Sequence, residues 1–339
     1  MYTQITEDLR RLCSAAGVAG QKEIEQTAVE LLSPLVDSVI VDTMGNVLGI
    51  RRGTTDEAPT ILLEAHMDEV GFLVTHIDEK GFLHVAAAGH ADERVLAAQP
   101  VTVYAEEPIS GVFCSVPPHL AKDDALPELG ARGIDVGLST EEAHQRIPLG
   151  TRVGFTPQFT TMDNGLVCSK ALDDRAGMAA ILHCLRLLPR SLPIHVAVAF
   201  CVQEELGCRG CAPAVRQLQP QEALVTDVSF AHTPDAEAYQ CGEMGKGVMV
   251  GISPILHEHM EKKLFSLAME NTIPYQTEVM AGTTGTDADS ISKAERGIPT
   301  GLLSIPLRFM HTPVEIVDVH DVAAVGELMA AYLKERGAV

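Results

Sequence analysis

Apolar residues recur at two different spacings along the chain, and the change in spacing divides the sequence into outer and middle parts. In the outer parts, residues 1–69 and 164–339, stretches with apolar residues three and four apart alternate with short continuous apolar runs. The first pattern is typical of amphipathic helices, and the second is typical of strands covered on both faces. We expect helices over 6–17, 21–36, 172–188, 253–271 and 319–337, and strands over 60–69, 194–202, 223–228 and 300–310.

Turn and cap residues mark the ends of several of these elements. Gly45 and Asn46 predict the turn of a hairpin within residues 38–53. Ser253 is expected to be the N-cap of the fourth helix, with Pro254 at its first position. Gly337 is expected directly after the last helix.

The middle part, residues 70–163, is β-rich. Short apolar segments lie between turns that contain Gly and Pro, and helical spacing nearly vanishes. We therefore expect an α/β fold, in which 1–69 and 164–339 form a mixed sheet with helices on both faces and 70–163 is an inserted β domain. The length of 339 residues also favours two domains.

The composition narrows the range of partners. The formal net charge of −21 opposes binding to nucleic acid or to anionic lipid. No apolar run approaches the ~20 residues of a membrane span, and the polar N-terminal segment does not resemble a signal peptide. We therefore expect a cytoplasmic protein whose eight cysteines are reduced. Cys208 and Cys211 form a C-x-x-C pair that lacks the second pair of a structural zinc site, so we expect small buried residues there, with a redox role as the alternative.

Histidines and carboxylates follow the predicted strands of the outer parts. In open α/β sheets, functional sites gather beyond the carboxyl ends of the strands. Five segments place such residues there, and chance accounts poorly for all five. They are His66 with Asp68, Glu204 with Glu205, Asp227, His311, and Asp173 with Asp174 at the start of a helix.

This mixture of histidine and carboxylate suits zinc, cobalt or manganese better than calcium. Two ions about 3.5–4 Å apart that share a bridging carboxylate recur in aminopeptidases. Adjacent side chains at a strand end point in different directions. One of the two glutamates can therefore ligate a metal, while the other faces the attacking water and accepts its proton.

The motifs that carry these residues resemble one family along nearly the whole chain and in that family's order. They are AHMDEVGFLV (65–74), KALDDRAG (170–177), QEELGCRG (203–210), TDV (226–228), GTDA (285–288) and PLRFMHTPVE (306–315). The set is similar to the cocatalytic metallopeptidases of the glutamyl aminopeptidase and tetrahedral (TET) aminopeptidase family. The resemblance implies the zinc-peptidase-like version of the α/β fold predicted above.

The resemblance also implies two divalent metal ions and their ligands. Asp173 would bridge the two ions. His66 and Asp227 would complete the ligands of one ion, and Glu205 and His311 those of the other.

Further roles follow from the same resemblance. Glu204 would be the general base, and Asp68 would orient His66 from behind. The Asp173–Asp174 peptide is expected to be cis. The loop that contains Asp287 is expected at the active site, with Asp287 as a possible substrate contact. Arg308 either pairs with a carboxylate near the substrate or covers the edge of the sheet.

The insertion resembles the family's dimerisation domain, a small β-barrel of PDZ-like type. By the same resemblance, dimers would assemble into a tetrahedral dodecamer with internal active sites, which limits access to short peptides.

The leading hypothesis is a dinuclear metalloaminopeptidase that acts on short peptides. A deblocking N-acyl hydrolase with the same metal centre stays open as the alternative. A carboxypeptidase is disfavoured because no Arg-rich cluster lies near the motifs. A non-catalytic shell protein is disfavoured because all seven proposed catalytic and ligand residues have the required types.

Overall fold

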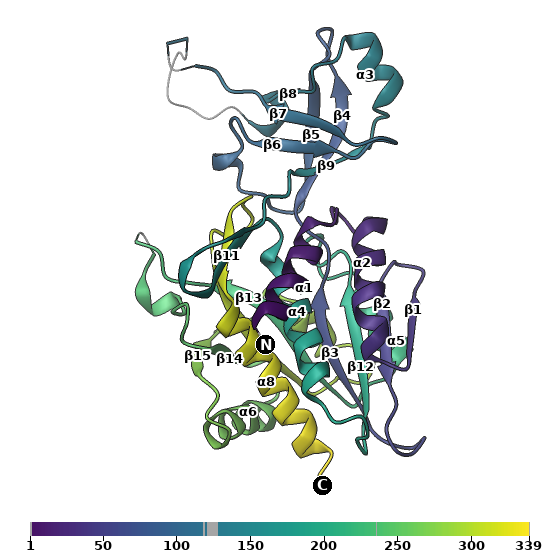
Figure 1. Ribbon diagram of the computed structural model, residues 1–339, viewed down its shortest axis with the longest axis vertical. Helices are drawn as coiled ribbons and strands as arrows, with labels where there is room; N and C mark the ends of the chain where they lie inside the picture. The colour runs from purple at the N-terminus through teal and green to yellow at the C-terminus, as the bar shows by residue number, and fades with distance from the viewer. Residues whose placement is uncertain (1, 118, 121–127, 235, 339) are drawn as a thin grey trace.

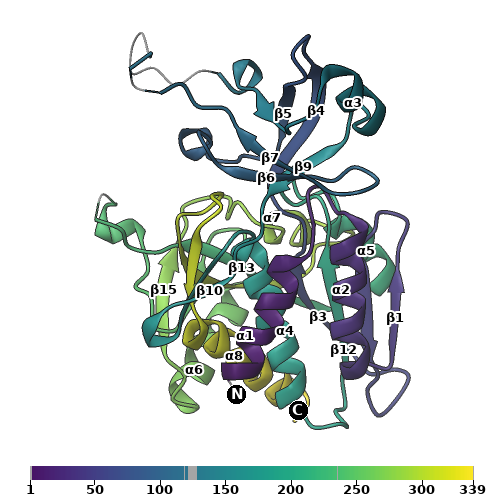
Figure 2. The same ribbon diagram turned by 45° about the horizontal axis from the view of Figure 1, so that its top comes forward.

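Two β structures make up the part of the chain that the structure describes, residues 2–117, 119–120, 128–234 and 236–338 (Figure 1). In this computed structural model, one is a mixed sheet of eleven strands and the other is a closed barrel of six. The barrel stands at one end of the molecule, above the sheet in Figures 1 and 2, and the C-terminus lies at the opposite end.

The large sheet combines a parallel centre with antiparallel margins. Its strands are β1 (Ser38–Val41), β2 (Val47–Arg51), β3 (Thr60–His66), β10 (Thr160–Thr161), β11 (Leu166–Ser169), β12 (His195–Cys201), β13 (Glu222–Phe230), β14 (Val248–Ile252), β15 (Tyr275–Val279), β16 (Thr300–Arg308) and β17 (Glu315–Asp318). The order is β1-β2-β12-β3-β13-β16-β17-β11-β10, with β14 paired to β16 and β15 paired to β14. β12, β3, β13 and β16 are parallel, so their carboxyl ends meet at one edge.

Side chains of the central strands alternate between two apolar layers, as the period of a strand requires. Ile61 and Leu63 of β3 belong to the larger core, whereas Leu62 belongs to a smaller core on the other face. The helices of the larger core are α1 (Tyr2–Ser14), α2 (Lys22–Leu32), α4 (Leu172–Leu187), α6 (Glu258–Glu270) and α8 (Val319–Arg336), and those of the smaller core are α5 (Cys211–Leu218) and α7 (Ala288–Ile291). The predicted mixed sheet with helices on both faces is therefore confirmed.

The barrel has its own hydrophobic core. Its strands, in the order in which they pair, are β4 (Gly71–Ile77), β5 (Leu83–Ala88), β8 (Ile134–Asp135), β7 (Ile109–Phe113), β6 (Pro100–Val103) and β9 (Arg152–Phe155). The ring of Phe72 packs edge-on against Phe113 and Phe155, with centroids 5.1 and 5.9 Å apart. Only four residues separate β3 from β4, so the barrel begins close to the edge where the carboxyl ends of the central strands meet.

One local prediction was wrong, and one short helix was not predicted. A short helix, α3 (Thr140–Arg146), lies in the β-rich part and begins with a capping box formed by Ser139 and Glu142. The wrong prediction concerns α6, which begins at Glu258 and not after Ser253. The hydroxyl of Ser253 donates to the carbonyl of Gly282, and Leu256 N–H donates to Ser253 O, so this Ser-Pro pair forms a turn before the helix.

Among the described residues, no helix is long and apolar enough to cross a membrane.

Candidate metal centre

A cavity of about 400 Å³ opens at the carboxyl ends of the central strands. Six of the seven residues predicted as ligands or catalytic groups line it, although they come from five separate segments of the chain. They are His66, Asp173, Glu204, Glu205, Asp227 and His311. The seventh, Asp68, is fully buried behind the cavity wall.

The strand positions of these residues differ in detail from the prediction. His66 is the last residue of β3, as expected, but β13 continues for three residues beyond Asp227. β16 ends at Arg308, and His311 lies in the following turn with a φ of 62°. Asp173 lies at the start of α4, where the backbone is not helical and the Asp173–Asp174 peptide is cis, as predicted.

The two adjacent glutamates occupy a turn and do not end a strand. β12 stops at Cys201, and Gln203 turns the chain with a φ of 62°. The N–H groups of Gly207 and Cys208 both donate to the carbonyl of Glu204, at 2.8 and 2.9 Å. The turn, and not the alternation of a strand, therefore sets the directions of Glu204 and Glu205.

Asp173 lies between two groups of side chains. Its Oδ1 is 2.9 Å from Nε2 of His66, which is 3.9 Å from Oδ1 of Asp227. Its Oδ2 is 3.4 Å from Nε2 of His311, which is 3.5 Å from Oε1 of Glu205. The two oxygens of Asp173 thus face two different pairs, each made of one imidazole and one carboxylate.

Sequence reasoning gave no function to two residues that position His311. Nδ1 of His311 bonds to the backbone carbonyl of His90, at 2.9 Å, so this nitrogen is the donor and Nε2 is free to face Asp173. The carboxylate of Glu315 accepts hydrogen bonds from the N–H groups of His311 and Asp173, at 2.8 and 3.1 Å. Glu315 lies within the PLRFMHTPVE motif, which was the available signal, whereas His90 acts through its backbone and carries none.

Asp68 connects His66 to the glutamate turn. Its Oδ1 accepts from the N–H of Glu204, at 3.1 Å, and lies 3.7 Å from Nδ1 of His66. The second distance is too long for a hydrogen bond, so in this geometry Asp68 acts on His66 through charge.

Burial and mutual charge shift the pKa values of the cluster. Burial raises the pKa of Glu204 to about 7 and that of Glu205 to about 8, where the charge of Asp173 adds to the effect. The pKa of His311 rises to about 9, because the bond to Asp173 and the charge of Glu205 outweigh burial. The pKa of Asp173 falls despite burial, because His311 and His66 hold its carboxylate.

The donor set fits divalent cations. Asp173, Glu205 and Asp227 are buried carboxylates, with side chains 8%, 7% and 9% exposed. None of the described residues that line the cavity is Lys or Arg. His66, Asp173 and Glu205 each offer one ligand atom, and these atoms lie within 4.8 Å of one another. Buried anions without a counter-charge are unfavourable, and imidazole with carboxylate is the ligand set of catalytic zinc.

The two weaker candidates lie outside the cavity lining. Asp287 is 1% exposed and lies behind the wall, although Thr284, Gly285 and Thr286 of the same loop do line it. Arg308 donates from Nε to the backbone carbonyl of His232, at 2.9 Å. The structure therefore brings neither side chain to the cavity surface.

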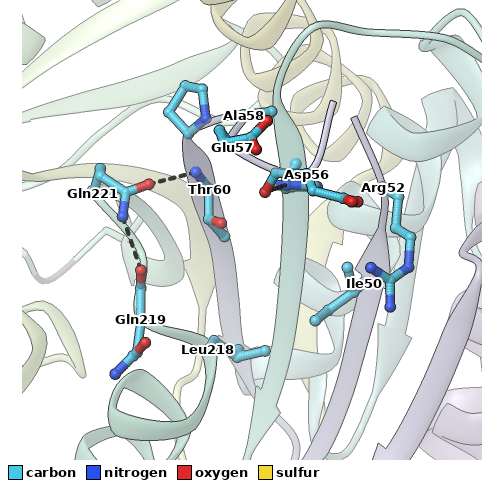
Figure 3. Close-up of a pocket in the computed structure, with 11 residues that line it drawn as sticks. Ile50, Arg52, Asp56, Glu57, Ala58, Thr60, Leu218, Gln219 and Gln221 are labelled. Atoms are coloured by element: carbon cyan, nitrogen blue, oxygen red, sulfur yellow. Dashed lines mark hydrogen bonds between the residues drawn. The ribbon is translucent and has the colours of Figure 1, made fainter. Parts of the chain in front are cut away.

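A second and larger cavity, about 540 Å³, lies at the opposite, amino ends of β3 and β12 (Figure 3). Its polar groups bond to one another. Gln221 accepts from Thr60 N–H and donates to Gln219 O, and His195 Nδ1 accepts from Gly53 N–H. No group of convergent buried carboxylates or histidines comparable to the metal centre lines it among the described residues, so the smaller cavity is the candidate active site.

The fold and the cluster define a class: a hydrolase of α/β fold whose histidine and carboxylate cluster suits divalent metal. Comparison with known proteins gives the family. Residues 45–328 match the family described as M42 glutamyl aminopeptidase, and the chain belongs to this family. It is therefore a peptidase of the hydrolase class, and the family depends on metal.

The similarity to known proteins extends over nearly the full length of the chain. The chain is 32% identical to lysyl aminopeptidase of Pyrococcus furiosus, over 97% of this chain and 96% of the relative. The structure is similar to that of aminopeptidase APDkam598 from Desulfurococcus kamchatkensis, with a TM-score of 0.92, 32% identity and coverage of 98% and 95%. It is also similar to the TET1 peptidase of Pyrococcus horikoshii, with a TM-score of 0.86, 28% identity and coverage of 98% and 99%.

Proposed function

We propose that the chain is a dinuclear aminopeptidase that removes N-terminal residues from short peptides. One observation carries the proposal: the two oxygens of Asp173 face two separate imidazole–carboxylate pairs, His66 with Asp227 and His311 with Glu205. This geometry supports a bridging role for Asp173 between two divalent ions, zinc, cobalt or manganese. When bound, such ions supply a Lewis acid and a water of lowered pKa.

The side chains would divide the remaining work. Glu204 lines the cavity beside the ligands, and burial raises its pKa to about 7. A base with a pKa near the working pH accepts and returns a proton efficiently. Glu204 would therefore take the proton of the attacking water and pass it to the departing amine. The N–H of Glu204 is held by Asp68, which fixes the base relative to His66.

The cavity walls support a preference for neutral N-terminal residues. Apart from the metal-binding cluster, Glu204 and His90, the described residues that line it are uncharged, and they include Val228, Phe230 and Met310. A charged substrate side chain would find no opposite charge there other than the metal-binding cluster, Glu204 and His90. The family is described as glutamyl and the Pyrococcus relative as lysyl, so specificity varies within this fold.

A homo-oligomer is supported by the solved relatives, one of which is described as assembling into a tetrahedron or an octahedral shell. We propose a tetrahedral dodecamer built from dimers that the barrel joins, with residues 70–163 as the dimerisation domain. Twelve chains of 36.3 kDa amount to about 436 kDa, and a mass in solution that stays at one or two chains would contradict this assembly.

Substrate choice tests the proposed function. Metal-stripped protein would be reloaded with zinc, cobalt or manganese and given aminoacyl-nitroanilides with neutral, acidic and basic side chains, beside their N-acetylated forms. Release only from the free amines, and only after reloading, is expected. Release from the acetylated forms alone would support the deblocking N-acyl hydrolase in its place.

A further inference from the structure

Two carboxylates without hydrogen-bond partners lie behind the wall of the active-site cavity. Glu64 and Asp287 are each 1% exposed. None of their four carboxylate oxygens has a hydrogen-bond partner among the described residues, and no ion pair joins either carboxylate to Lys, Arg or His in the same part of the chain. The cluster lies outside the dinuclear centre and has no part in the mechanism proposed above.

The location makes these charges unfavourable. Glu64 lies in the middle of the sheet, where Ala199 of β12 and Val225 of β13 are its neighbours in register. Both neighbours belong to the smaller hydrophobic core, beneath α5 and α7. Two adjacent carboxylates in an apolar layer require a counter-charge or a proton.

Thiols complete the cluster. Cys201, the last residue of β12, is fully buried. Its Sγ, an oxygen of Glu64 and an oxygen of Asp287 all lie within 4.8 Å of one another. Cys211, the first residue of α5, is also fully buried, and its Sγ donates to the carbonyl of Cys208 at 3.3 Å. Three side chains, from β3, β12 and the loop before α7, thus meet between the sheet and two helices, and the thiol of Cys211 lies beside Asp287.

We propose that Glu64, Cys201 and Asp287, with Cys211 as a fourth ligand, bind a third divalent cation directly behind the dinuclear centre. Thiolate with carboxylate suits zinc or cobalt, whereas calcium and magnesium require oxygen ligands. Four ligands without an open position are typical of a structural site. The expected role is therefore to position neighbouring groups.

The groups that the ion would position belong to the active site. Asp287 lies one residue after the loop segment Thr284–Thr286 that lines the cavity. Cys208 offers an Sγ that lies within 4.8 Å of Asp287 and Glu204, and it donates to Oε1 of Glu204 at 3.3 Å. An ion on Asp287 would fix one wall of the cavity and, through Cys208, the side chain of the general base.

Thiolate ligation gives a signature that the dinuclear centre cannot produce. The centre contains only imidazole and carboxylate ligands, so near-ultraviolet charge transfer from thiolate to Co²⁺ reports the cysteine site alone. The chain would be produced in medium supplemented with Co²⁺, so that buried sites fill during folding, and then dialysed. Bound metal per chain would be counted by mass spectrometry, and the absorption spectrum would be recorded on the same sample.

Three ions per chain and a thiolate band are expected. Cys201→Ala and Asp287→Asn should each lose one ion, and Cys201→Ala should lose the band. Cys184→Ala, which changes a thiol buried in α4, should keep both signals. Two ions and no band in the unaltered chain would overturn the proposal and leave a proton shared by the two carboxyl groups. Peptidase activity measured on the same samples reports the proposed function separately, because that function requires only the dinuclear centre.

Discussion

At the scale of single residues, the sequence indicates the groups that touch the reaction better than the groups that support them. His66, Glu204 and Asp227 are chemically reactive residues that lie in or just after apolar runs of the sequence, and such residues can be recognised without a structure. Glu315 supports the site by accepting hydrogen bonds from two backbone N–H groups, and His90 supports it through its backbone carbonyl. A glutamate that accepts from two N–H groups has no distinctive spacing, so only the structure assigns it this role.

Glu315→Gln tests this support. The carboxylate holds the N–H groups of Asp173 and His311, and an amide in its place would turn one N–H donor toward another. We expect metal affinity to fall roughly 10–100-fold, as for other groups that orient ligands, in titrations of stripped protein. Glu270→Gln, an exposed change at the end of α6, should leave affinity unaltered. Equal metal affinity in both variants would show that Glu315 does not position the metal ligands.

At the scale of elements, long periodic segments were predicted well and short or locally bonded ones were not. The helices α4 and α8 and the strands β3 and β12 lie where apolar spacing places them. The seven residues of α3 are too few for a periodic pattern, and a Ser-Pro pair fits a turn as well as a helix start. The glutamate turn depends on Gln203 at positive φ, a conformation that side chains other than Gly seldom adopt.

The first turn of α4 gives a prediction at this scale. Gly177 N–H donates to Asp174 Oδ1, and a Cβ at Gly177 would lie 2.4 Å from Asp174 Oδ2. Gly177→Ala must therefore displace Asp174, and we expect it to lower the free energy of unfolding by about 1–3 kcal/mol and to reduce metal content. Denaturant unfolding and metal analysis would measure both.

Gly130→Ala is the matched control, since a Cβ there meets no described atom within 4 Å and the backbone needs no positive φ. If Gly177→Ala were as stable and as rich in metal as this control, the packing of Asp174 would not support the centre.

At the scale of the whole molecule, the sequence predicted the class of each part, and the proposed assembly rests on the resemblance to relatives. The mixed sheet follows from alternating strand and helix patterns. The loss of helical spacing in the middle part predicts a β-rich insertion, and the family resemblance implies that this insertion is a barrel. How the barrel closes and stands beside the sheet edge depends on pairing between distant strands such as β4 and β9, which no local pattern encodes.

Metal removal should make the stability of the protein depend strongly on pH. In the metal-free fold, the pKa values of Glu204, Glu205 and His311 are raised to about 7, 8 and 9, from ordinary values of 4.5, 4.5 and 6.5. Raised values mean that the fold favours the protonated forms. The stability that these groups contribute to the fold is complete below their ordinary pKa values and is lost as the pH rises through 7 to 9.

We therefore expect the melting temperature of stripped protein to fall between pH 6 and pH 9. Bound metal should restore about 2.7 kcal/mol at a free concentration of 100 Kd. Thermal unfolding with and without metal at both pH values measures this. A stripped protein that becomes more stable toward pH 9 would show that these groups do not carry the predicted charges.

Glu204→Gln removes the carboxylate that we propose as the base of a two-metal peptidase. Metal content and kcat would be measured together on the unaltered chain and on the variant, with a free-amine substrate. We predict unchanged metal content with a kcat lower by about 10²–10⁴-fold, the usual contribution of general acid–base catalysis. Full turnover with both metals bound would contradict the account.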